Sequence, residues 1–162
     1  MNDRDVGGRE GAAEPARQVS VLVVDDHRAF AESLALLIDG EEGLRVVGTV
    51  TTGEEAVREC ARLAPDVVLL DLALPDIDGI EVTRRIMAAN PATRVVLIAA
   101  VAGDDAVARA IEAGARGFVP KVSAVDKCVP VIRGAAGGRI VLPDDRRDAI
   151  IALVERHRAS RS

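Results

Sequence analysis

Short apolar runs alternate with longer amphipathic stretches along most of the chain. The runs, rich in β-branched residues, are Val19–Val24, Leu44–Val50, Asp66–Leu70, Arg94–Ala99 and Gly117–Val119. Two segments, Val67–Leu70 and Val95–Ala99, are apolar at every position, as strands covered on both faces must be. The runs therefore predict five β-strands, two of which lie inside a sheet.

The stretches between the runs repeat apolar residues at helical spacing. They predict helices near Arg28–Ile38, Glu54–Leu63, Gly79–Ala89, Asp104–Ala113 and Ser123–Ala135. Five strand–helix repeats of this length favour an α/β fold with an open parallel sheet and helices on both faces. Because crossovers are right-handed, a doubly wound strand order such as 2-1-3-4-5 is the economical arrangement.

Two prolines test this assignment. Pro120 ends the fifth run and has no N–H to donate, so it is tolerated only if the fifth strand lies at the edge of the sheet. The order 2-1-3-4-5 provides that edge. Pro130 falls inside the fifth helical stretch, and we expect it to kink this helix or delay its start.

The two ends of the chain depart from the alternating pattern. Residues Met1–Gln18 hold three glycines, a proline and seven charges without apolar periodicity, which predicts a disordered tail. At the other end, residues 139–162 are expected to form a linker and an amphipathic helix over Asp144–Ser160. The folded domain is therefore expected to comprise residues 19–138.

Composition narrows the class of protein. A chain of 162 residues with 49% hydrophobic positions is long enough for one domain with a real core. Its net charge of −5 excludes a globally basic nucleic-acid binder. The longest apolar run, Val95–Ala102, is too short to span a bilayer, and Cys60 and Cys128 lack metal-ligand spacing. We expect a cytoplasmic protein with no membrane partner.

The last helical stretch carries arginines at positions 156, 158 and 161. They either contact nucleic acid or complement the helix dipole at a solvated helix end. A helix-turn-helix DNA reader needs two helices joined by a tight turn, and only one helix is predicted here. Direct DNA binding is therefore expected only if a helix-turn-helix domain follows Ser162.

Three aspartates fall at the carboxyl ends of predicted strands. Asp25 and Asp26 follow the first strand and Asp71 follows the third. These strands are neighbours in the order 2-1-3-4-5, so the carboxylates meet at the crevice where doubly wound sheets bind ligands. Like charges need a neutralising cation, and hard oxygen ligands at a wet site favour Mg²⁺. Lys121, after the fifth strand, reaches the same rim and pairs with a carboxylate or a phosphoryl oxygen. The simpler alternative is that these aspartates only cap the following helices.

Several segments resemble the receiver domain of two-component response regulators. They are Val23–His27 (VVDDH), Leu70–Gly79 (LDLALPDIDG) and Gly114–Phe118 (GARGF), with Lys121 following. The resemblance covers about Val19–Gly138, and the Asp-Asp-His opening is similar to the NarL/LuxR-type subclass, whose members usually carry a C-terminal helix-turn-helix. It implies a flavodoxin-like (CheY-like) fold and a signalling phosphoprotein without independent substrate turnover.

The resemblance also implies a role for each matching residue. Asp71 corresponds to the aspartate that accepts a phosphoryl group from a sensor histidine kinase in a phosphorelay, which usually feeds transcription regulation. Asp26 corresponds to the direct Mg²⁺ ligand, and Asp25 to the acid that holds the ion through water. Ala73 corresponds to the residue that lends a backbone carbonyl to the metal. Lys121 corresponds to the lysine that contacts the phosphoryl group.

Two positions matter for the switch that follows phosphorylation in this family. Ala99 stands where the family usually has a Ser or Thr, whose hydroxyl moves to bond the phosphoryl group. Thr93 lies at the other end of the same strand and cannot replace it. The aromatic partner of the switch corresponds to Phe118, which lacks a hydroxyl and favours burial; the alternative is that Phe118 is plain core.

Two other functions compete with a phosphorylated receiver. A degenerate receiver would act as a phosphorylation-independent interaction module, for example through homodimerisation. Ala99 and Pro130 favour it, whereas the intact acids and Lys121 oppose it. A Mg²⁺-dependent phosphatase would need a second aspartate two residues beyond the nucleophile, and that position is Ala73.

Overall fold

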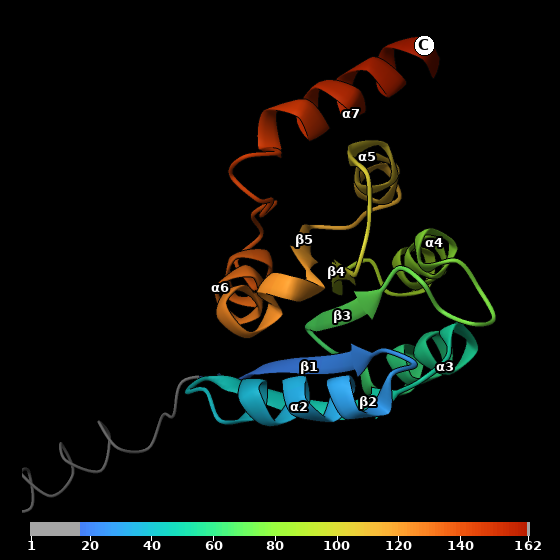
Figure 1. Ribbon diagram of the computed structural model, residues 1–162. Helices are drawn as coiled ribbons and strands as arrows, with labels where there is room; N and C mark the ends of the chain where they lie inside the picture. The colour runs from blue at the N-terminus through green and yellow to red at the C-terminus, as the bar shows by residue number, and fades with distance from the viewer. Residues whose placement is uncertain (1–16, 162) are drawn as a thin grey trace, which may run out of the picture.

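The computed structural model describes residues 17–161. Most of the predicted tail, Met1–Gln18, lies outside the described residues, and Arg17 already pairs with Asp66 at 2.7 Å. In chain order the elements are β1 (Val19–Val24), α2 (Arg28–Asp39), β2 (Leu44–Val50), α3 (Gly53–Leu63), β3 (Val67–Asp71), α4 (Gly79–Ala89), β4 (Arg94–Ala99), α5 (Asp104–Glu112), β5 (Gly117–Pro120), η1 (Lys121–Ser123), α6 (Ala124–Ala136) and α7 (Arg147–Arg161) (Figure 1).

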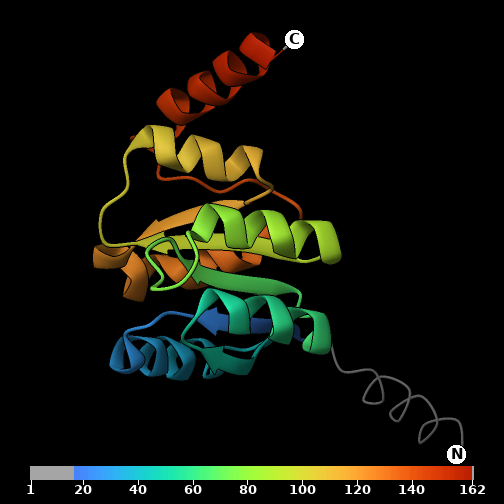
Figure 2. The same ribbon diagram turned by 90° about the vertical axis from the view of Figure 1, so that its right-hand side faces the viewer.

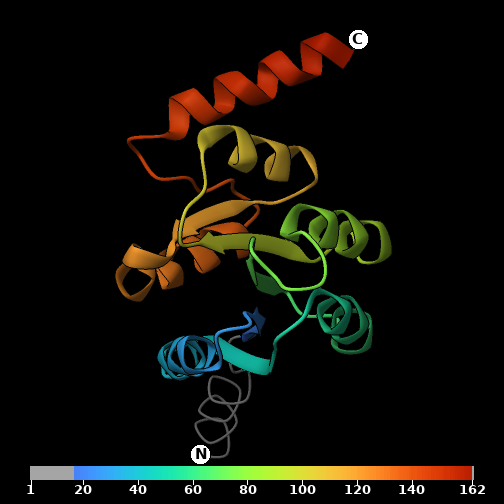
Figure 3. The same cartoon turned by 45° about the vertical axis from the view of Figure 1, so that its right-hand side comes forward.

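The five strands form one parallel sheet in the order β2-β1-β3-β4-β5. This confirms the predicted doubly wound fold. Helices α2 and α6 cover one face of the sheet, and α3, α4 and α5 cover the other (Figure 3). The predicted strand boundaries agree within one residue: Asp71 is the last residue of β3, and Pro120 is the last residue of β5.

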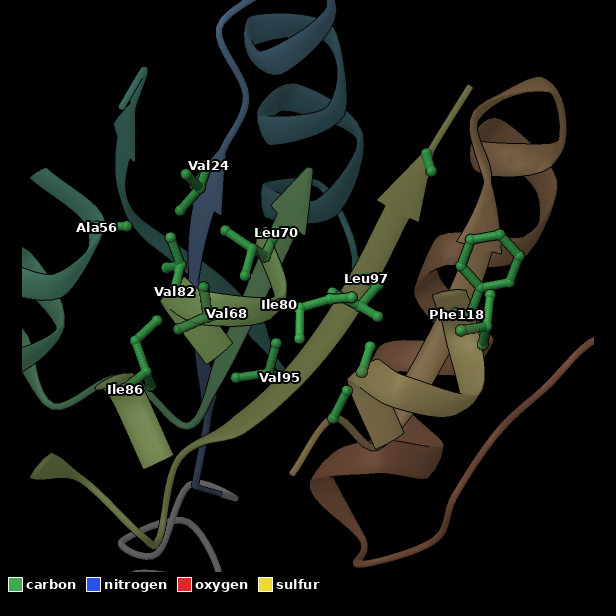
Figure 4. Packing of buried hydrophobic residues seen from close by; sticks show 14 of the residues in the cluster. Val24, Ala56, Val68, Leu70, Ile80, Val82, Ile86, Val95, Leu97 and Phe118 are labelled. Carbon is green, nitrogen blue, oxygen red and sulfur yellow. The ribbon is translucent and has the colours of Figure 1, made fainter. Parts of the chain in front are cut away.

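Alternate residues of each central strand enter two separate cores, as the pleat of a strand requires. On the side of α3 and α4, the strand residues Val68, Leu70 and Leu97 pack against Val82 and Ile86 (Figure 4). Val67, Leu69 and Val96 point to the opposite face, toward α2 and α6. Since almost no aromatic side chain is present, aliphatic residues fill both cores.

The structure confirms the expectation for Pro120 and contradicts part of the expectation for Pro130. Pro120 lies in β5, the edge strand, as predicted. Helix α6 begins at Ala124 and continues through Pro130 to Ala136, so the expected delay of its start is wrong, while the alternative, a kink at Pro130, stays a prediction. Pro130 and Asp126 are both exposed. The carbonyl of Asp126, which loses its helical partner, therefore belongs to the exposed side of α6, the side on which water can replace a lost hydrogen bond.

The residues after α6 pack onto the domain rather than extending from it. Val141 makes a parallel bridge to β5: its N–H donates to Arg116 O at 2.9 Å, and its carbonyl accepts from Phe118 N at 3.1 Å. Helix α7 then lies against α5 (Figures 1 and 2). It starts at Arg147, three residues later than predicted, because a turn closed by Arg146 N and Pro143 O precedes it. Within residues 17–161, no helix has the length and apolar character needed to cross a membrane.

Candidate functional site

Asp25 and Asp71 lie side by side at the carboxyl ends of β1 and β3, which pair directly. Both are 1% exposed. The backbone holds one oxygen of each carboxylate: His27 N donates to Asp25 Oδ1 at 2.8 Å, and Ala73 N donates to Asp71 Oδ1 at 3.0 Å. The second oxygen of each acid is thereby left to face the crevice between the strands.

Lys121 brings a positive charge to these two second oxygens. Its Nζ lies 2.9 Å from Asp25 Oδ2 and donates to Asp71 Oδ2 at 3.1 Å. The side chain is 15% exposed. The ring of Phe30, on α2, lies 4.9 Å from Nζ and adds a cation–π contact. Sequence reasoning anticipated the lysine at this rim but not the aromatic ring beneath it.

The charges in the crevice do not balance. Burial raises the pKa of Asp71, and the nearby charge of Asp25 adds to this, against the opposing bonds from Ala73 N and Lys121. Burial alone would lower the pKa of Lys121, but the carboxylates of Asp25 and Asp71 outweigh it and hold that pKa above its ordinary value. The two buried carboxylates thus outnumber the single ammonium beside them, an excess of negative charge that a bound cation would relieve.

The residues present suit a metal ion. Ligand atoms of Asp25, Asp26, His27 and Asp71 all lie within 4.8 Å of one another. Asp26 is the wettest of the acids, with its side chain 34% exposed. A carboxylate-rich set open to water is the environment in which Mg²⁺ keeps part of its hydration shell. His27 was not singled out in the sequence, although its Nδ1 lies 3.2 Å from Asp25 Oδ1 and 3.3 Å from Asp26 Oδ1.

Helix capping does not explain the strand-end acids. The side chain of Thr52 caps α3, Asp78 caps α4, and α2 has no side-chain cap. A further acid that the sequence did not reveal, Asp76, accepts from Gly53 N at 2.8 Å and from Glu54 N at 2.9 Å, so it supports the start of α3. The side chains of Asp25, Asp26 and Asp71 thus do not cap the helices that follow β1 and β3.

The loop after Asp71 passes very close to the start of α4. A Cβ on Gly79 would lie 2.7 Å from Leu72 Cα and 2.9 Å from Asp71 O. Gly79 N also donates to Leu72 O at 3.0 Å. Only glycine allows this approach, so Gly79 holds the backbone of the loop next to the buried carboxylate.

The side of the crevice formed by β4 carries a methyl group. Ala99 ends β4, is buried, and pairs with Pro120 of β5. Thr93 is at the opposite end of the strand, where its hydroxyl donates to Pro65 O at 2.8 Å. Phe118, in β5, is buried in the core on the α3–α5 side. The structure thus places Ala99, Thr93 and Phe118 where the sequence predicted, while the switching role of Phe118 stays a prediction.

Together, the strand order and the crevice define a flavodoxin-like α/β domain with an acidic, lysine-bearing pocket at its switch point. Residues 21–133 match the response regulator receiver domain family. The chain belongs to this family, which confirms the resemblance read from its motifs. That family is a class of signalling domains rather than of metabolic enzymes.

Known relatives agree with this assignment. The chain is similar to the response regulator GacA of Pseudomonas aeruginosa, with 36% identity over 126 residues that cover 77% of this chain and 59% of the relative. It is 32% identical to the response regulator UvrY of Escherichia coli K12, over 85% of this chain and 63% of the relative. A crystal structure of a LuxR-family two-component response regulator from Aurantimonas sp. SI85-9A1 matches with a TM-score of 0.76 and 32% identity, over 88% of this chain and 99% of that one. The chain thus spans less than two thirds of the curated relatives' length.

Proposed function

We propose that this protein receives a phosphoryl group on Asp71 from a sensor histidine kinase and passes the signal on by protein association. The observation that carries the proposal is the position of Asp71 Oδ2, 3.1 Å from the Lys121 ammonium inside a cluster of acids. Transfer of a phosphoryl group needs little beyond a positioned nucleophile and compensation of the charge on the phosphoryl oxygens. The crevice offers both.

In the proposed transfer, a carboxylate oxygen of Asp71 attacks the phosphorus of a phosphohistidine. The new bond joins this oxygen to phosphorus, the P–N bond breaks, and its electron pair returns to the imidazole, which takes a proton from solvent. Ala73 N holds Asp71 Oδ1, which orients the nucleophile. Lys121 neutralises a phosphoryl oxygen. Mg²⁺, held by Asp25, Asp26, Asp71 and the carbonyl of Ala73, would neutralise the others when bound.

The wider setting follows from the same proposal. The relatives are response regulators, so we place this chain in a cytoplasmic two-component pathway that feeds transcription regulation. The domain boundaries are proposed as residues 19–138 for the receiver and 139–162 for the C-terminal part. We expect no turnover of an independent substrate.

Intact-mass measurement after incubation with acetyl phosphate and Mg²⁺ tests the proposal. The wild type is expected to gain one phosphoryl mass, and Asp71→Asn none. Asp76→Asn is the matched control, because Asp76 lies in the same loop but caps α3 instead of facing the crevice. It is expected to be labelled like the wild type. Labelling of Asp71→Asn, or an unlabelled wild type, would refute Asp71 as the acceptor.

A further inference from the structure

Residues 139–161, here called the C-terminal segment, lie outside the part of the chain that matches the receiver family. They nevertheless make specific contacts with it. Val141 pairs with the edge of β5, and Leu142 is buried beside it. Arg139 N also donates to Gly134 O of α6 at 3.0 Å, and an open groove lined by Val122, Pro130 and Leu142 lies farther along, between the segment and α6. The segment is therefore attached on the side of β5 and α5.

Arg146 is the central contact of this attachment. Its Nε donates to Asp104 Oδ1 at 2.8 Å, and its Nη2 donates to Ala102 O at 2.6 Å. Its guanidinium carbon lies 5.2 Å from the centre of the Phe118 ring. Ala102 belongs to the loop that leaves β4 directly after Ala99. One side chain thus joins the C-terminal segment to this loop and to the buried aromatic ring of β5.

Helix α7 carries the attachment further along α5. Ile150 and Val154 are buried in the core shared with α5. At the far end of α5, Glu112 pairs with His157 Nδ1 at 2.6 Å and with Arg161 at 2.6 Å. The segment is therefore fixed at both ends of α5, through Asp104 at its start and Glu112 at its end.

We propose that the C-terminal segment is a built-in brace, in which Arg146 holds the β4–α5 loop and Phe118 in one arrangement. Movement of this loop requires the two hydrogen bonds and the ring contact of Arg146 to break. The surface of α5 and β5 beneath the segment is then available to another protein only when the segment detaches. One consequence rests on the proposed function: phosphorylation of Asp71 produces a small response while the brace is in place, because Ala99 offers no hydroxyl that would favour a displaced loop.

Hydrogen–deuterium exchange of the full, unphosphorylated chain tests the brace without involving Asp71. Arg146→Gln is expected to raise exchange about tenfold in the β4–α5 loop and in α7, equivalent to about 1.4 kcal/mol of local stability. Arg146→Lys keeps the charge near Asp104 but lacks the planar guanidinium. Its exchange in these regions is expected to lie between that of the wild type and that of Arg146→Gln. Arg156→Gln, the same change at an exposed arginine of α7, is the matched control.

Amides of β3 serve as an internal standard, since their unchanged protection shows that the sheet is intact. Exchange in Arg146→Gln that equals the wild type in both regions would overturn the brace. So would an increase of the same size in Arg156→Gln. If Arg146→Gln loses protection in β3 as well, its sheet is disturbed and Arg146→Lys replaces it as the test. Exchange in Arg146→Lys that equals the wild type in the β4–α5 loop and in α7 would then overturn the brace.

A second measurement addresses the consequence for signalling. With beryllofluoride and Mg²⁺, the change in exchange across the β4–α5 loop is expected to be at least about threefold larger in Arg146→Gln than in the wild type. Equal changes in the two proteins would contradict the brace. Absence of beryllofluoride binding in the ¹⁹F spectrum would instead contradict the proposed acceptor role of Asp71. The exchange measured on the unphosphorylated chain would still test whether the brace exists.

Discussion

The ammonium of Lys121 reaches across the end of β4 to donate to the carboxylate of Asp71 at 3.1 Å. The two residues are 50 positions apart: Asp71 ends β3, and Lys121 begins the short helix η1 that follows β5. The same ammonium lies 2.9 Å from Asp25. One cation therefore compensates two buried acids, and the crevice depends on it whenever no metal is bound.

Replacing this lysine leaves two buried carboxylates without a cation. Lys121→Ala is expected to lower the free energy of unfolding by roughly 3 kcal/mol in the absence of divalent ions, because removing one partner of a buried pair exposes the other to the full desolvation cost. Mg²⁺ is expected to restore part of this loss by binding the native state. Urea unfolding with and without Mg²⁺ measures both effects. Lys127→Ala, an exposed lysine on α6, is the control, and an equal loss there would contradict the prediction.

Asp26 is expected to matter more than Asp25 for Mg²⁺ binding. Asp25 already has one oxygen bonded to His27 N and the other next to Lys121, whereas Asp26 is partly exposed and free to coordinate the ion directly. Asp26→Asn should therefore weaken Mg²⁺ affinity by more than about tenfold, and Asp25→Asn by less. Calorimetric titration with Mg²⁺ compares the two variants. Equal losses would show that the direct and water-mediated roles are wrongly assigned to the two acids.

The sequence predicts the crevice because its acids sit at strand ends. In a parallel doubly wound sheet, strand order alone brings Asp25, Asp71 and Lys121 to one edge. It does not predict Phe30, whose contact with Lys121 depends on how α2 is rotated against the sheet. Helical spacing likewise cannot show which surface an amphipathic helix will cover.

Two features after β5 illustrate the limits of local rules. Amphipathic spacing predicts α7, but the hydrogen-bond partners of Arg146, which are Asp104 and Ala102, lie more than 40 positions earlier and are set only by packing against α5. The rule that proline interrupts a helix correctly identifies a lost hydrogen bond at Pro130. It overestimates the effect on where α6 starts, because the cost of the freed carbonyl depends on which side of the helix is buried.

A hydroxyl at position 99 is expected to strengthen the response to phosphorylation. Ala99→Thr supplies a donor for the phosphoryl group, and Ala99→Val adds a side chain of the same shape without a donor, which controls for crowding at this buried position. A hydrogen bond to a charged group contributes roughly 1.5–3 kcal/mol, or one to two orders of magnitude in a two-state equilibrium. Amide spectra around Phe118 with beryllofluoride should change more in Ala99→Thr than in the wild type or Ala99→Val. The idea fails if the wild type already responds as strongly as Ala99→Thr.

The attachment of α7 to α5 is expected to weaken in acid through Glu112. Burial by itself would raise the pKa of Glu112, but its pairing with His157 and Arg161 outweighs burial and holds the pKa below its ordinary value of 4.5. A carboxyl whose pKa is lower in the folded state stabilises that state fully above its unfolded pKa, and the contribution is lost as the pH falls through the folded value. Glu112→Gln should therefore be less stable than the wild type above about pH 4.5, and the difference should shrink as the pH falls below this value.

Urea unfolding of the two proteins from neutral pH to about pH 3 measures this difference. Exchange of the α7 amides over the same range assigns it to the helix contact. Glu155→Gln is the matched control, because Glu155 is an exposed acid on α7 itself, and its difference from the wild type should stay near zero throughout. A gap between wild type and Glu112→Gln that persists unchanged well below pH 4.5 would show that Glu112 stabilises the contact by packing rather than by charge, since packing does not depend on protonation.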